Sequence, residues 1–284
     1  MEQTQILAIM GSPGSGKTFT SVKLATELAL QKKNVIIIAL DSSCPVVPYL
    51  LPSDVVHDVS IGELLTKMQI SQTDILKALV TVPDNPYISL LSYKLGESIS
   101  SYPKIVATKV IEFLSNIRGL ADYIIIDCSS MIEADVATII ALSFAEKVLK
   151  LGTSDLKGIS YFYTADRLLA DSKFKKDKNI IAISNLKDWQ EWENVAPQYG
   201  GATFTIPYCK ELERQFSELT LFEKLKEEQS TSYSLEISEM ARQIFALEIP
   251  VTAKKKKEKA PQKSMKTETK RTFRNPFSKN KGEF

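Results

Sequence analysis

The sequence predicts an α/β fold in which a mainly parallel sheet is covered by helices on both faces. Short β-branched, apolar runs alternate along the chain with stretches of helix length, and this alternation is typical of right-handed βαβ units. The run at residues 34–40 is nearly continuous in apolar residues, which indicates a strand buried on both faces. A glycine-rich loop lies between the first apolar run and a helical stretch, and this context is also typical of an α/β domain.

Taken in order, the elements follow from local patterns. The predicted strands are residues 6–10, 34–40, 87–92, 122–126, 147–151, 179–184 and 202–206. The predicted helices are residues 19–30, 105–117, 134–144, 155–169, 188–195, 210–219 and 232–247. Prolines mark residues 41–52 as a loop at the carboxyl end of a strand, where open α/β sheets place ligands. Ser60 and Glu63 have the spacing of a capping box before a short helix.

Composition indicates an ordinary globular protein. The 284 residues are 44% apolar and 25% charged, and no run approaches the roughly 20 apolar residues of a membrane span. The start of the chain lacks the pattern of a secretory signal. Three widely spaced cysteines without a C-x-x-C pair argue against disulfides and zinc. We therefore expect a cytoplasmic protein, with peripheral attachment at the inner face of the membrane as a further expectation.

Charge divides the chain into two parts. Residues 249–284 contain 12 Lys and Arg but only 3 Glu, whereas residues 1–248 carry more acidic than basic residues. We predict one folded domain over residues 1–248 and a disordered basic tail over residues 249–284. The tail has the charge to bind an anionic membrane surface, DNA or an acidic protein. The acidic body weighs against DNA as the main partner.

The glycine-rich loop carries the main chemical signal. Gly11, Ser12, Pro13, Gly14, Ser15, Gly16, Lys17 and Thr18 match the pattern G-x-x-x-x-G-K-[ST] at every specified position. Backbone N–H groups in such a loop surround a polyphosphate, and the helix that follows directs its positive end at the same anion. Lys17 is expected to reach the β- and γ-phosphates and Thr18 to bind Mg²⁺. Phe19, next in the chain, is included in the predicted nucleotide site.

Two aspartates extend this site. Asp127 ends a strand of isoleucines, which is where a P-loop protein holds a carboxylate beside the metal. Asp41 follows the strand after the P-loop helix, and it is placed to orient or deprotonate a water that faces the γ-phosphate. We also include Asp41 with Thr18 and Asp127 in the predicted metal site. The alternatives are a strand-capping role for Asp127 and a turn role for Asp41.

These residues, in this order, resemble the MinD/ParA group of ATPases, and within it the localisation ATPases of Tad-type pilus assembly. The resemblance covers about residues 4–225 and implies ATP and Mg²⁺ as ligands and a nucleotide-dependent homodimer. It also implies that Asp41 positions the hydrolytic water, that Asp127 supports Mg²⁺ and that Asn185 contacts adenine. Pro207 and Tyr208 match a segment that borders the base in that family.

Three positions depart from the family pattern. Ser12 stands where ParA-type members carry a second lysine that reaches across the dimer, and Ala39 replaces the first of two paired acids. Met131 stands where a glycine often follows Asp127. Because a trans-acting cation contributes orders of magnitude in rate, we expect hydrolysis to be slow or to need a partner.

The resulting hypothesis is a weak ATPase that positions or assembles a larger membrane-associated machine, such as a pilus, secretion or conjugation apparatus, together with its protein components. A DNA-partitioning ATPase and a nucleotide-binding scaffold without turnover are the alternatives. The architecture is also similar to that of bacterial tyrosine kinases, but no tyrosine follows Tyr233. Asn185-Leu186-Lys187-Asp188 resembles a guanine-reading N-K-x-D motif with the lysine one place late, so ATP is favoured over GTP.

Overall fold

The computed structural model describes residues 4–52, 55, 60–98 and 100–247, and the predicted tail, residues 249–284, lies outside them. In the described residues, eight strands form one sheet in the order β3-β4-β2-β5-β1-β6-β7-β8. All neighbouring strands are parallel except β3 and β4. The predicted α/β class with a mainly parallel sheet is therefore confirmed.

The strands are β1 (Gln5–Gly11), β2 (Val35–Ala39), β3 (Val80–Val82), β4 (Asn85–Ser92), β5 (Tyr123–Asp127), β6 (Lys147–Thr153), β7 (Asn179–Leu186) and β8 (Phe204–Pro207). The α-helices are α1 (Lys17–Leu30), α2 (Val47–Leu50), α3 (Ile61–Thr66), α4 (Gln72–Ala78), α5 (Ala107–Ile117), α6 (Val136–Phe144), α7 (Leu156–Leu168), α8 (Trp192–Val195), α9 (Lys210–Ser217) and α10 (Thr231–Phe245). Short 3-10 helices lie at Ile132–Ala134, Lys176–Lys178, Ala196–Tyr199 and Glu228–Ser230.

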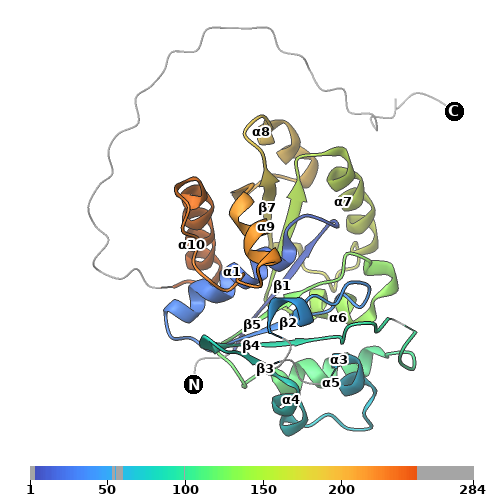
Figure 1. The fold of residues 1–284 in the computed structure, drawn as a ribbon. Coiled ribbons are helices and arrows are strands. Elements are labelled where there is room, and N and C mark those ends of the chain that lie inside the picture. The colour runs from blue at the N-terminus through green and yellow to red at the C-terminus, as the bar shows by residue number, and fades with distance from the viewer. Residues whose placement is uncertain (1–3, 53–54, 56–59, 99, 248–284) are drawn as a thin grey trace, which may run out of the picture. The chain divides into compact units, whose positions relative to one another are not determined.

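Helices cover both faces of the sheet, as Figure 1 shows. Alternate residues of each central strand enter opposite cores: Ile37 packs with α1, α9 and α10, whereas Ile36 and Ile38 pack with α3 to α7. All five residues of β2 are buried. This two-sided burial explains why the strand reads as a continuous apolar run instead of an alternating one.

The structure corrects several local predictions. Ser60 caps α3 by accepting from the Gly62 amide, while Glu63 contacts Lys94, so the capping box predicted there is wrong. A complete capping box instead lies at the start of α4, between Ser71 and Asp74. Both α4 and the edge strand β3 were missing from the prediction, because each is too short for its periodicity to stand out.

The helix predicted over residues 188–195 is also wrong in extent. Its α-helical part is only Trp192–Val195, and a 3-10 helix continues over Ala196–Tyr199. The predicted loop at residues 41–52 contains the short helix α2. Among the described residues, none of the helices has the length and apolar character needed to cross a membrane.

Strand register brings the chemically important loops together. Asp127 at the end of β5 is in register with Ile9 of β1 and with Ala39 of β2. The carboxyl ends of these three parallel strands therefore meet at one edge of the sheet, where α/β proteins bind ligands. The P-loop, Asp41 and Asp127 all emerge at this edge.

Candidate functional site

The P-loop has the backbone that an anion site requires. β1 ends at Gly11 and α1 begins at Lys17, two residues earlier than predicted. Gly14 and Gly16 have φ values of 77° and 82°, in the left-handed region that glycine adopts most readily. Within the described chain no side chain caps the first turn of α1, and that turn carries no acidic residue. Its N–H groups and positive end are thus available to an anion.

Close packing holds the loop in place. A Cβ added to Gly11 would lie 2.4 Å from Ser15 Oγ and 2.7 Å from the Leu151 carbonyl oxygen. The Ser184 hydroxyl donates to the Ser15 carbonyl oxygen at 2.8 Å, which fastens the loop to β7. Pro13 lies exposed in the loop, whereas Ser12 is buried.

Thr18 and Asp127 lie at the phosphate end of the site. The Thr18 hydroxyl donates to Asp127 Oδ2 at 2.5 Å, and Asp127 is buried. Burial raises the pKa of the Asp127 carboxyl to about 6, while Lys17 and Thr18 favour the ionised form. A hydroxyl and one carboxylate are hard oxygen ligands that suit Mg²⁺, which is usually bound by one or two carboxylates together with substrate phosphates. These two residues fit the predicted metal.

Lys17 contacts a residue that the sequence analysis did not select. Its ammonium donates to Ser130 Oγ at 2.5 Å and to the carbonyl oxygens of Gly11 and Ser12 at 3.3 and 3.5 Å. Ser130 in turn donates to the Gly11 carbonyl oxygen at 3.0 Å. Its position three residues after Asp127, next to Met131, which departs from the family's glycine-containing pattern, was the available signal.

Asp41 lies beside Asp127, on the loop that follows β2. The Leu40 amide donates to the Asp127 carbonyl oxygen at 2.9 Å, and the charge of Asp41 acts to raise the pKa of Asp127. Asp41 Oδ1 accepts from the amides of Ser43 and Cys44 at 3.0 and 3.3 Å. The carboxylate thus orders its own turn while facing the same edge as the P-loop.

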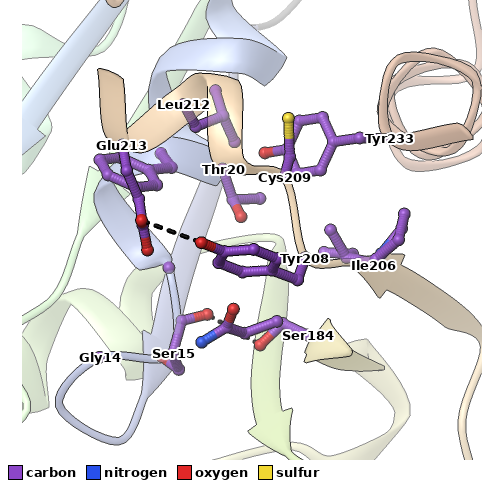
Figure 2. Close-up of a pocket in the computed structure, with 14 residues that line it drawn as sticks. Gly14, Ser15, Thr20, Ser184, Ile206, Tyr208, Cys209, Leu212, Glu213 and Tyr233 are labelled. Atoms are coloured by element: carbon purple, nitrogen blue, oxygen red, sulfur yellow. Dashed lines mark hydrogen bonds between the residues drawn. The ribbon is translucent and has the colours of Figure 1, made fainter. Parts of the chain in front are cut away.

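A pocket continues from the P-loop toward β7, β8, α9 and α10 (Figure 2). It brings together seven predicted nucleotide-binding residues: Gly14, Ser15, Gly16, Phe19, Asn185, Pro207 and Tyr208. Asn185 has a φ of 56° at an irregularity between β7 and β8. The Tyr208 hydroxyl donates to Glu213 Oε2 at 2.9 Å, which fixes an aromatic ring on the pocket wall.

The pocket wall also contains residues absent from the prediction, which include Thr20, Leu212, Glu213 and Tyr233. Two lining residues have buried hydroxyls: Ser15 Oγ has no hydrogen-bond partner among the described residues, and the Tyr233 hydroxyl interacts with Thr20. Tyr233 had only a weak signal in the sequence, because the apolar pattern over residues 232–247 predicts a helix that simply packs against the rest of the domain.

Comparison with known proteins identifies the family. A family model described as "AAA domain" matches residues 4–177, which is more than half of the chain and includes the P-loop, Asp41 and Asp127. The chain belongs to the MinD/ParA-type P-loop ATPases. Among curated proteins, none matches the sequence significantly.

Solved structures agree with this ATPase fold. The MinD cell division protein of Aquifex aeolicus is 21% identical, with a TM-score of 0.65 over 88% of this chain and 100% of that one. A putative plasmid partition protein from Borrelia burgdorferi, bound to AMPPNP, is 18% identical, with a TM-score of 0.66 over 86% and 98%. The septum site-determining protein MinD of Pyrococcus horikoshii, complexed with Mg-ADP, is 13% identical, with a TM-score of 0.64 over 85% and 96%.

The predicted residues of this ATPase therefore form two adjoining parts. Lys17, Thr18, Asp41 and Asp127 lie at the phosphate end, and Phe19, Asn185, Pro207 and Tyr208 line the pocket beside it. A nucleoside triphosphate has the same division into a charged chain and a flat base. Their assignment to individual atoms of the nucleotide stays a prediction.

Proposed function

We propose that this MinD/ParA-type protein is an ATP-binding switch that hydrolyses ATP slowly and positions or assembles a larger machine at a membrane. The observation that carries the proposal is the continuity of the site. The uncapped start of α1, the Thr18–Asp127 contact and the aromatic-walled pocket lie along one path. The Mg-ADP and AMPPNP complexes of the related folds are consistent with this choice of ligand.

Different residues bind the phosphates, the metal and the base. N–H groups of the loop from Gly14 to Lys17 hold phosphate oxygens, and Lys17 leaves Ser130 to reach the β- and γ-phosphates. Thr18 and Asp127 hold Mg²⁺, which neutralises negative charge on the phosphates when it is bound. Tyr208 and Asn185 border the adenine. The side chains given these roles all lie at the site.

Slow turnover follows from the side chains at two positions, Ser12 and Asp41. Ser12 has no charge to offer a second subunit, so the contribution of a trans-acting cation is missing. Asp41 orients the attacking water, but its carboxylate also binds two amides of its own turn. We propose that ATP favours a homodimer and that hydrolysis releases it.

The setting is proposed from charge and from family likeness. The basic segment, residues 249–284, gives a cytoplasmic protein weak, salt-sensitive attachment to an anionic membrane. The likeness to Tad-type localisation ATPases favours a pilus, secretion or conjugation apparatus, whose protein components would be the partners. Nucleoid-based partitioning and a scaffold role without hydrolysis are the competing functions.

ATP binding and phosphate release, measured on matched variants, test the catalytic part. We expect Lys17→Ala to weaken ATP binding by at least about tenfold, because it removes the main cation for the phosphates. Asp41→Asn should keep ATP binding and lower the rate of phosphate release by about 10²-fold or more. Asp84→Asn, an exposed carboxylate in the β3–β4 turn, serves as the control and should behave as wild type.

Three outcomes would contradict this proposal. Equal phosphate release from wild type and Asp41→Asn removes the role of Asp41, and tight ATP binding without any release favours the scaffold. No detectable binding of ATP to the wild type by calorimetry removes the proposal as a whole.

A further inference from the structure

A second cavity lies on the face of the sheet that α6 and α7 cover. Its volume is about 370 Å³, within the range of small-molecule sites. It shares no lining residue with the pocket beside the P-loop. We call it the α6–α7 cavity and define it by its charged lining residues, Lys150, Asp166, Lys176 and Lys178. With three lysines and one aspartate, the lining carries net positive charge.

Lys150 brings a charge to a position of the sheet that is usually apolar. It lies in the middle of β6, in register with Met10 of β1 and Ile181 of β7. Such central parallel strands normally bury apolar side chains on both faces, and a lysine withdrawn from water is costly unless it is paired. The Lys150 side chain is 13% exposed, and its ammonium forms an ion pair with Asp166 Oδ1 at 2.6 Å. The Asp166 side chain is 53% exposed, so the pair can be reached from solvent.

Further N–H donors line the same cavity. The Lys178 ammonium donates to two carbonyl oxygens at the end of α6, at 2.9 and 3.0 Å, which fixes its position. Lys176, Asn179 and Gln198 also belong to the lining, and within the described part of the chain their side chains form no hydrogen bond or ion pair. Ammonium and amide N–H groups are the donors that bind carboxylate and phosphate oxygens. The cavity therefore offers donors to an anion from several directions.

The rest of the lining is mainly apolar and includes Leu142, Val148, Phe174 and Ile181. A bare inorganic anion would leave these side chains in contact with water. An anion with a compact apolar body would cover them and gain from their burial. The mixture of donors and apolar side chains thus favours an organic anion.

We propose that the α6–α7 cavity is a second ligand site, which binds a small organic anion through a carboxylate or phosphate group. The acidic group lies among the three lysines, and the apolar body lies against the walls. This site goes beyond the proposed function, because no part of the nucleotide site contributes to it. A purely structural account explains the ion pair of Lys150 and the helix-end contacts of Lys178, but it gives no role to Lys176, Asn179 and Gln198.

Naphthoate and naphthyl phosphate are the probes, since they combine the two acidic groups with the same flat apolar body. Their binding to the full-length protein is measured by equilibrium dialysis without nucleotide. We expect at least one of them to bind with a Kd of about 1 mM or lower, which is within reach of ligands of this size. Naphthol, which is uncharged at neutral pH, should bind at least about tenfold more weakly. The proposal is overturned if neither probe binds or if naphthol binds equally well.

Lys176→Gln locates the bound probe. Lys176 is exposed and unpaired within the described structure, so its replacement should leave Tm unchanged. We expect probe binding to weaken about threefold to tenfold, because a charge-assisted hydrogen bond is lost. Lys175→Gln is the matched control, since it removes the same charge from the adjacent exposed residue, which is outside the lining. Equal binding by the two variants would place the probe elsewhere, for example in the P-loop, and overturn the proposal.

Asp166→Asn should have the opposite effect. It removes the carboxylate that competes with the ligand for Lys150, so probe binding should tighten about threefold or more. Asp188→Asn removes the same charge from an exposed residue outside the lining and should leave binding unchanged. Unchanged or weaker binding in Asp166→Asn would overturn the role of Lys150 as an anion contact. None of these measurements contains ATP, so a failure of the proposed ATP site leaves their outcome unaffected.

Discussion

Individual atoms of the P-loop have little room to move. Ser15 Oγ and the Leu151 carbonyl oxygen lie where a Gly11 side chain would begin. The Ser184 hydroxyl also holds the loop, because it donates to the Ser15 and Gly152 carbonyl oxygens at 2.8 and 3.2 Å. The loop is therefore held by β6 and β7 before any phosphate arrives, so little ordering remains to be done when a ligand binds.

Gly11→Ala tests this packing. A Cβ at 2.4 and 2.7 Å from its neighbours forces the loop or β6 to shift. We expect the free energy of unfolding to fall by about 1–3 kcal/mol and ATP affinity to fall by at least about tenfold. Urea denaturation and calorimetry measure the two quantities.

Gly96→Ala is the control for backbone strain. Gly96 has a φ of 83°, and within the described structure a Cβ there would meet open space. It should cost about 1 kcal/mol of stability through strain alone and leave ATP binding unchanged. Wild-type affinity in Gly11→Ala would contradict the role of close packing at the loop.

Helix α1 connects the two parts of the site at the scale of elements. Its first turn follows the P-loop, and Lys23 in its middle reaches α9 and the segment after it. The Lys23 ammonium donates to Gln215 Oε1 at 2.8 Å and to the carbonyl oxygens of Leu221 and Glu223 at 2.7 Å each. Because α9 carries Leu212 and Glu213 of the pocket wall, a displacement of α1 would be transmitted to that wall.

The burial of Lys23 also leads to a prediction about how the stability of the protein depends on pH. Burial lowers the pKa of its ammonium to about 8, against the attraction of Cys209, Glu211, Glu223 and Glu27. As pH rises through this value, the folded protein loses the proton while the unfolded chain keeps it. The unfolded state then binds more protons, so the contribution of Lys23 to stability increases with pH.

The measurement is the difference in free energy of unfolding between wild type and Lys23→Met, followed from about pH 7 to about pH 9.5. We expect this difference to shift in favour of wild type as pH rises. Lys157→Met, at an exposed lysine on α7, should show no such shift. A difference that is flat, or that shifts toward the variant, would contradict the lowered pKa.

Charge is distributed unevenly over the whole molecule. Residues 1–248 carry the acidic excess, and residues 249–284 carry the basic one. A polybasic segment gains roughly 1 kcal/mol per Lys or Arg near an anionic membrane surface, and salt screens this gain. Phe273, Phe277 and Phe284 add apolar groups to the same segment.

Deletion of residues 249–284 tests the proposed attachment. Full-length protein should sediment with phosphatidylserine-containing vesicles at low salt and lose most of this binding at about 0.5 M salt, and the shortened protein should not bind. ATP binding should be the same in both, which provides the control for folding. DNA binding that survives the deletion would contradict the membrane proposal and favour partitioning.

The sequence by itself determined the fold class and most elements, and it predicted the residues at the phosphate end of the site. It could do so because central strands buried on both faces leave long apolar runs, and because a P-loop places its glycines, lysine and threonine at adjacent positions. Tertiary structure alone decided the short elements α4 and β3, the contact of Lys17 with Ser130, and the inner wall of the pocket with Tyr233. The elements α4 and β3 are too short for their periodicity to stand out. The Lys17–Ser130 contact and the pocket wall join residues far apart in the chain, whose approach is determined by strand order and helix packing.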